Sequence, residues 1–161
     1  MFVKRILIAT SIVISATLIS VAQSSNSVYF AVWGQSVHGV QMSMALTNDT
    51  ILPDAGMRLF VKINNASAEK ITLVDDFTAS LVSKSGEKYE IVHPIVVHFS
   101  VPLVDLNPGE SHVWAIFTII SSDTKPGDYV LSGTRHFVLD KKTLKLESNS
   151  IKMRIISSHS Q

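Results

Sequence analysis

Apolar and polar residues alternate in twos along most of the chain after residue 28. In MRLFVKIN (57–64), every second residue from Met57 to Ile63 is apolar, and most of the residues between them are basic or polar. Successive side chains of a strand point to opposite faces, so this period predicts a strand with one buried side. The same pattern occurs at 40–46, 71–73, 77–81, 129–139 and 151–155.

Turn-forming residues separate these runs at the spacing expected for a β-sandwich or barrel. They are NDT (48–50), PDAG (53–56), NNAS (64–67), SKSGEK (83–88), NPGES (107–111), KPGD (125–128) and LDKKT (139–143). Proline before glycine in the middle of a turn favours type II geometry, because glycine accepts a positive φ at little cost. No stretch after residue 22 has apolar residues at the spacing of one helix face. The pattern predicts an all-β fold, an antiparallel β-sandwich of about seven to nine strands.

Two stretches are apolar on both faces. HVWAIFTII (112–120) has apolar residues at odd and even positions, as expected for a central strand covered on both sides. In a two-layer sandwich one of these faces meets solvent, so we expect something to cover it. EIVHPIVVHFSVPLVDL (90–106) is also apolar, and Pro94 and Pro102 place it at a sheet edge or in a loop. It is either tucked under the sheet, which we favour, or presented to a partner.

The first 22 residues have the layout of a secretory signal peptide. Lys4 and Arg5 precede an apolar stretch, and Ser20 and Ala22 occupy the small-residue positions of a cleavage site. An uncleaved membrane anchor is the alternative, because the stretch approaches the length of a span. We expect cleavage, with residues 23–161 forming one exported domain that is periplasmic or extracellular and has no stable membrane span.

Composition excludes several classes of protein. Without the signal peptide, the chain keeps 12 of its 14 basic residues and all 13 acidic residues, and the basic residues do not cluster. We therefore expect no nucleic-acid partner. The chain has no cysteine, which excludes thiol catalysis, zinc fingers and iron–sulfur sites. The core alone must hold the domain together.

The stretch VHGVQMSM (37–44) brings together a histidine and two methionines, which are side chains that bind copper. On a strand, His38, Met42 and Met44 point the same way. Consecutive residues on one face are about 7 Å apart, however, so His38 is out of reach of an ion held by the methionines. Methionine commonly fills gaps in cores. We interpret the stretch as core and expect no metal site.

The sequence predicts no enzyme and no cofactor. No GxSxG, HExxH or P-loop pattern is present. Asp75 and Asp76 are adjacent, which suits a strand end or turn better than an acid/base pair. Asn48 and Asn65 begin sequences that match the glycosylation acceptor pattern. Both also suit turns, the interpretation we favour.

The segments WGQSVHGVQMSMAL, MRLFVKINNAS and ITL together resemble bacterial extracytoplasmic immunoglobulin-like domains. These domains open with Trp-Gly, continue with Gly-Val-Gln and reach a strand that ends in NxS. LVDLNPGES, KPGDYVL and SNSIKMRI agree with the same pattern over residues 33–156. The layout is also similar to the bacterial intracellular proteinase inhibitor family. Met42 and Met44 replace the Leu or Val of relatives, and Pro53 begins a longer turn than theirs. The resemblance implies an immunoglobulin-like sandwich.

We expect a small exported binding or accessory module at the bacterial cell envelope, with another envelope protein as partner. Its contact surface is predicted to include Trp33, His93, Val97, Phe99 and Trp114, with the two tryptophans as aromatic anchors unless both are core. The resemblance implies proteinase inhibition as an alternative, and periplasmic metal binding is a further one.

Overall fold

The computed structural model describes residue 30, residues 32–91 and residues 103–157, and all secondary structure in these parts is β. The strands are β1 (Val40–Leu46), β2 (Thr50–Ile51), β3 (Gly56–Asn65), β4 (Ile71–Leu73), β5 (Thr78–Ser83), β6 (Lys88–Glu90), β7 (Val104–Leu106), β8 (Ser111–Ile119), β9 (Gly127–Leu139), β10 (Lys142–Glu147) and β11 (Ile151–Ile155). No helix in the described residues is long and apolar enough to cross a membrane. The predicted leader lies outside them.

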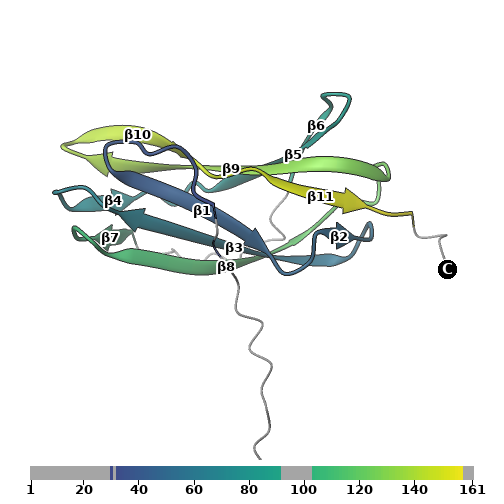
Figure 1. Ribbon diagram of the computed structural model, residues 1–161, viewed down its shortest axis with the longest axis horizontal. Helices are drawn as coiled ribbons and strands as arrows, with labels where there is room; N and C mark the ends of the chain where they lie inside the picture. The colour runs from purple at the N-terminus through teal and green to yellow at the C-terminus, as the bar shows by residue number, and fades with distance from the viewer. Residues whose placement is uncertain (1–29, 31, 92–102, 158–161) are drawn as a thin grey trace, which may run out of the picture.

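The strands form two sheets that run along the long axis of the molecule (Figure 1). Sheet A is β1-β3-β8, in which both pairs are antiparallel. Sheet B is larger and is built on β9, which pairs with β10 and β11 and also with β4 and β5. β2 pairs with β11 in parallel, so the predicted antiparallel order has one exception.

One apolar core lies between the sheets and confirms the predicted alternation. The buried members of sheet A include Leu59, Val61 and Ile63 of β3, and those of sheet B include Leu131 and Phe137 of β9. A Cβ atom at Gly133 would lie 2.6 Å from the Met44 sulfur and 2.9 Å from the Phe77 ring. The two sheets approach each other so closely at residue 133 that only glycine, which has no Cβ atom, fits there.

The methionines of the VHGVQMSM stretch are part of this core, as predicted. Met42 is 0% and Met44 2% exposed. His38 is on no strand: it lies with Gly39 in a turn where both residues have positive φ (50° and 82°) and Val37 and Val40 exchange backbone hydrogen bonds. The histidine is exposed on that turn, away from the buried sulfurs.

The two Pro-Gly turns differ. At 107–110, Gly109 has a φ of 81° and the Glu110 N–H donates to the Asn107 carbonyl at 3.0 Å, as expected for a type II turn. Gly127 has a φ of 158° and begins β9 in a nearly extended conformation. Proline before glycine therefore predicted type II geometry correctly at the first turn only.

Three expectations about the strands are wrong. The described residues form eleven strands rather than seven to nine. The difference arises because strands as short as β2 and β6 pair with a neighbour but are too short to show an alternating apolar pattern in the sequence. β10 was missed although Leu144 and Leu146 alternate in it. Finally, a central strand was expected at 112–120, whereas in the described parts β8 is the outermost strand of sheet A and pairs with β3 alone.

Candidate interaction surface

The outer side of β8 carries a row of exposed apolar side chains, here called the β8 face: Val113, Ala115, Phe117 and Ile119. Val113 is 47%, Phe117 59% and Ile119 48% exposed. The even-numbered residues of the same strand face the core: Trp114 pairs with Val61, and Ile116 with Leu59. Apolarity on both sides of 112–120 therefore arises from one buried row and one exposed row.

Side chains of β3 extend the β8 face. Phe60 lies opposite Ala115 and is half-buried, and the exposed Arg58 lies opposite Phe117. The Arg58 guanidinium carbon is 4.5 Å from the centroid of the Phe117 ring, within the range of a cation–π interaction. An aromatic ring with an arginine beside it is a combination enriched at protein interfaces.

The N-terminal segment covers the other half of the outer side of sheet A. The Ser43 hydroxyl donates to the Val32 carbonyl, and the Lys62 ammonium lies 5.6 Å from the centroid of the Trp33 ring. Ser43 and Ala45 are buried under this segment although they point away from the core. Within the described residues, this cover lies over β1, and the side chains of the β8 face remain exposed.

Beneath β8, Trp114 belongs to an aromatic and basic cluster between the sheets. Its ring stacks on His112 at 5.5 Å and meets Phe77 edge-on at 6.4 Å. The Arg135 guanidinium carbon lies 4.6 Å from its centroid, and Arg135 Nε donates to the Val74 carbonyl at 2.7 Å. Burial lowers the pKa of Arg135, partly offset by the nearby Asp75 and Asp76 carboxylates.

Of the five predicted contact residues, the structure describes only the two tryptophans, and these lie on different sides of sheet A. Trp33 is half-buried on the outer side of sheet A, whereas Trp114 is half-buried and points between the sheets. His93, Val97 and Phe99 lie outside the described residues. Sequence reasoning did not single out Phe117 and its neighbours as an exposed surface, although the second apolar row of 112–120 was the signal for them.

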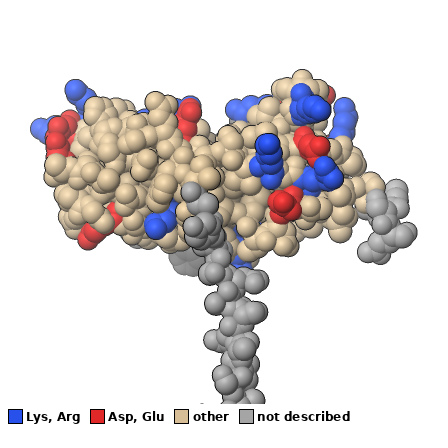
Figure 2. Space-filling view, viewed as in Figure 1, with Lys and Arg blue, Asp and Glu red and all other residues tan. Residues whose placement is uncertain are grey.

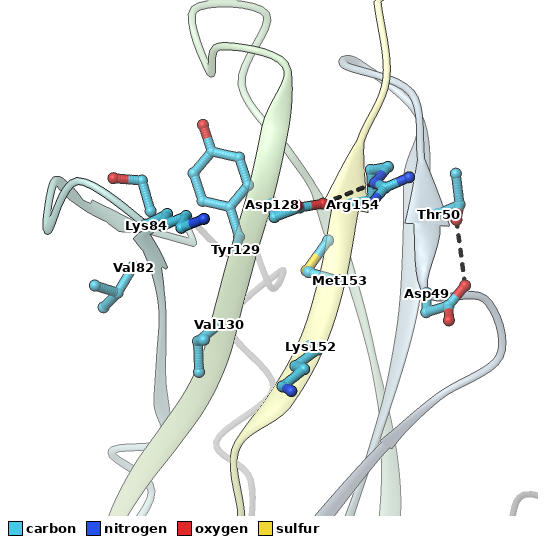
Figure 3. Close-up of a pocket in the computed structure, with 11 residues that line it drawn as sticks. Asp49, Thr50, Val82, Lys84, Asp128, Tyr129, Val130, Lys152, Met153 and Arg154 are labelled. Carbon is cyan, nitrogen blue, oxygen red and sulfur yellow. Dashed lines mark hydrogen bonds and ion pairs between the residues drawn. The ribbon is translucent and has the colours of Figure 1, made fainter.

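A shallow groove of about 650 Å³ crosses the outer side of sheet B (Figure 3). Residues of β2, β5, β9 and β11 line it, with Val82 and Val130 among the apolar ones. Figure 2 shows charged side chains gathered toward the two ends of the molecule, with broad uncharged areas between them.

The charges of this groove are mixed and open to solvent. Arg154 Nε donates to Asp128 at 2.7 Å, which lowers the pKa of the Asp128 carboxyl and raises that of Arg154. Lys84 and Lys152 have no carboxylate within 4 Å among the described residues. The Tyr129 hydroxyl donates to the Lys125 carbonyl at 2.6 Å.

Two sequence candidates for chemistry have structural roles. Asp76 accepts the backbone N–H of His136 at 2.9 Å and also pairs with its imidazole, which ties the 74–77 segment to β9. Asn65 is 0% exposed, and its side-chain amide donates to the Glu69 and Leu106 carbonyls. In the folded domain this amide is inaccessible for glycosylation. No group of three or more His, Asp or Glu side chains in the described parts is placed to hold a metal.

No family model and no curated protein match the chain. Among solved structures, it is similar to the C-terminal domain of wzt, with 13% identity, a TM-score of 0.51, and coverage of 78% of this chain and 77% of that one. It is also similar to Spo0M, a sporulation control protein from Bacillus subtilis, with 13% identity, a TM-score of 0.51, and coverage of 76% and 51%. An ApaA protein from Bordetella pertussis has 13% identity, a TM-score of 0.49, and coverage of 74% and 98%. At such identities, the similarity to the first two structures supports an all-β fold and says nothing of activity.

Proposed function

We propose that this chain is a small, non-enzymatic binding module at the bacterial cell envelope, with an immunoglobulin-like β-sandwich fold. Its partner is another envelope protein, which it contacts through the β8 face. The exposure of Val113, Phe117 and Ile119 in a row on one strand carries this proposal. Contiguous apolar residues with a polar surround mark interaction sites on soluble domains.

The sequence and the fold support this proposal in different ways. The signal-peptide layout of residues 1–22 favours export, and two packed sheets with the predicted alternation favour the sandwich. Phe117 with Arg58 beside it provides an aromatic and cationic anchor for a partner. The groove of sheet B is lined by charges of both signs beside its apolar residues, so it offers no uninterrupted apolar row like that of the β8 face.

Replacing Phe117 with aspartate tests the contact surface. The side chain is more than half exposed, so we expect the variant to fold and to lose partners that the wild type retains in crosslinked pull-downs from the native envelope. Val130→Asp is the matched control, because Val130 is 38% exposed on a strand of the other sheet. Circular dichroism must first show that both variants have the wild-type fold. Equal capture by folded Phe117→Asp and by wild type would disprove a role for the β8 face.

Proteinase inhibition is the alternative that the family resemblance implies. It requires an exposed loop that binds a protease tightly. Purified domain that slows none of a panel of secreted proteases at micromolar concentration would remove this alternative, without bearing on the β8 face.

A further inference from the structure

The two edges of sheet A differ in how their backbone groups are satisfied. At the β1 edge, the Gly34 N–H donates to the Met42 carbonyl at 2.8 Å. The Asn149 side chain accepts the Met44 N–H at 2.6 Å and donates to the Met44 carbonyl at 3.1 Å. At the opposite edge, β8 has no partner strand besides β3 among the described residues. One edge is therefore closed by specific contacts, whereas the other, here called the open edge, has none in the part of the chain that the structure describes.

The open edge presents the backbone groups of the odd-numbered residues. The Asn65 N–H donates to the Glu110 carbonyl at 2.9 Å, just before β8. Backbone groups of successive residues in an antiparallel strand point to alternate sides. The N–H and C=O groups of Val113, Ala115 and Phe117 therefore point away from β3, toward the open edge. These residues also form the β8 face.

β8 lacks the devices that usually protect an edge strand. Ser111–Ile119 contains no proline and no Lys, Arg, Asp or Glu, although charges and prolines commonly block strand addition. At nine residues, β8 is longer than a typical strand.

We propose that the β8 edge binds a second copy of this chain. The two β8 strands pair antiparallel about a two-fold axis at Ala115, which joins the two copies of sheet A into one continuous sheet. In this register Val113 lies opposite Phe117 of the other copy, and Ala115 lies opposite itself. An apolar strand with no charge meets its own copy without like-charge repulsion, which is the self-complementarity that a two-fold interface requires.

This pairing goes beyond the proposed function, because it uses the edge of β8 rather than its face. In the pair, the two β8 faces lie side by side on the same side of the joined sheet. The apolar surface available to an envelope protein is thereby doubled. Strand-to-strand pairing buries little area compared with a stable dimer, so we expect the pair to dissociate on dilution.

Single-cysteine variants test the register, since the chain has no cysteine of its own. Ala115 is exposed, so Ala115→Cys leaves the core unchanged. The two Cys side chains would face each other across strands about 5.5 Å apart between Cα atoms. We expect a short bis-maleimide to join two copies of purified Ala115→Cys chain at high micromolar concentration.

The neighbouring positions provide matched controls. The pairing puts residue 113 of one copy about 14 Å from residue 113 of the other, because four residues of strand separate them. Val113→Cys alone and Phe117→Cys alone should therefore remain uncrosslinked. A mixture of the two variants should crosslink, because residue 113 lies opposite residue 117 of the other copy.

Sedimentation of the purified wild-type chain gives an independent measurement. We expect a dimer at high micromolar concentration, and a monomer for Ala115→Lys, in which two like charges would meet at the axis. The pairing would be overturned if the wild-type chain stays monomeric and the Ala115→Cys variant is not crosslinked. Equal crosslinking of all three single-cysteine variants would overturn the register. Neither result bears on Phe117→Asp and the envelope partner, so the two proposals fail separately.

Discussion

Arg135 is a charged residue in a position that the alternating pattern of β9 assigns to the core. It is 5% exposed, its Nε donates to a single backbone carbonyl, and its guanidinium lies over Trp114. It forms no ion pair within 4 Å with the described residues. The free energy gained from the carbonyl and the ring opposes the cost of removing a cation from water, and the two are of similar size.

Substitutions at Arg135 separate packing from charge. We expect Arg135→Met, which keeps an apolar stem over Trp114, to change the free energy of unfolding by less than about 1 kcal/mol. Arg135→Ala leaves a cavity between the sheets and should lose about 2–4 kcal/mol. Urea unfolding followed by tryptophan fluorescence measures both. Equal losses for the two variants would show that the charge, not the stem, stabilises this position.

At the scale of elements, the N-terminal segment depends on one glycine. A Cβ atom at Gly34 would lie 2.0 Å from the Glu147 carbonyl oxygen and 2.7 Å from the Ser148 carbonyl carbon. Both atoms belong to the backbone, so no side-chain movement relieves the contact. Gly34 therefore allows the chain to pass between β1 and the end of β10.

Replacing Gly34 with alanine should detach this segment from sheet A. We expect a loss of about 1–3 kcal/mol in unfolding free energy. In a Trp114→Phe background, Trp33 emission should also shift to the red as the ring leaves Lys62. Gly56→Ala is the control, because a Cβ atom there meets nothing within 4 Å. If Gly34→Ala behaves like Gly56→Ala in both measurements, the segment is not held at this point.

The apolar pattern of β8 shows how much of a strand's surroundings its own sequence predicts. Apolar residues on both faces of 112–120 predicted two hydrophobic environments, and the inner one is the core. The prediction of a central strand failed because a strand's neighbours are set by distant segments. Whether a second face meets a sheet, a partner or solvent is not encoded in the strand itself.

At the scale of the whole molecule, low net charge matters for association. The formal net charge is +1 for the full chain, and β8 carries no ionisable residue besides His112. Two copies therefore repel each other little at long range, and their pairing relies on backbone hydrogen bonds and apolar contacts.

The proposed β8 pair should accordingly tolerate salt. We expect the dissociation constant to change by less than about threefold between low salt and 0.5 M sodium chloride, because no ion pair contributes to it. Sedimentation equilibrium at several salt concentrations measures this. Dissociation that rises steeply with salt would indicate contacts between charged groups elsewhere on the surface.

Sequence alone was enough to predict the all-β class, most of the strands and which side of each is buried. These follow from a local period of two, so Leu59, Val61 and Phe137 were assignable without knowing their neighbours. Three features became visible only in the fold: β8 lies at an edge of sheet A as described, the N-terminal segment covers β1, and Trp114 points inward beside Arg135. Each of these depends on contacts between segments far apart in the chain, and a local pattern carries no record of which segments meet.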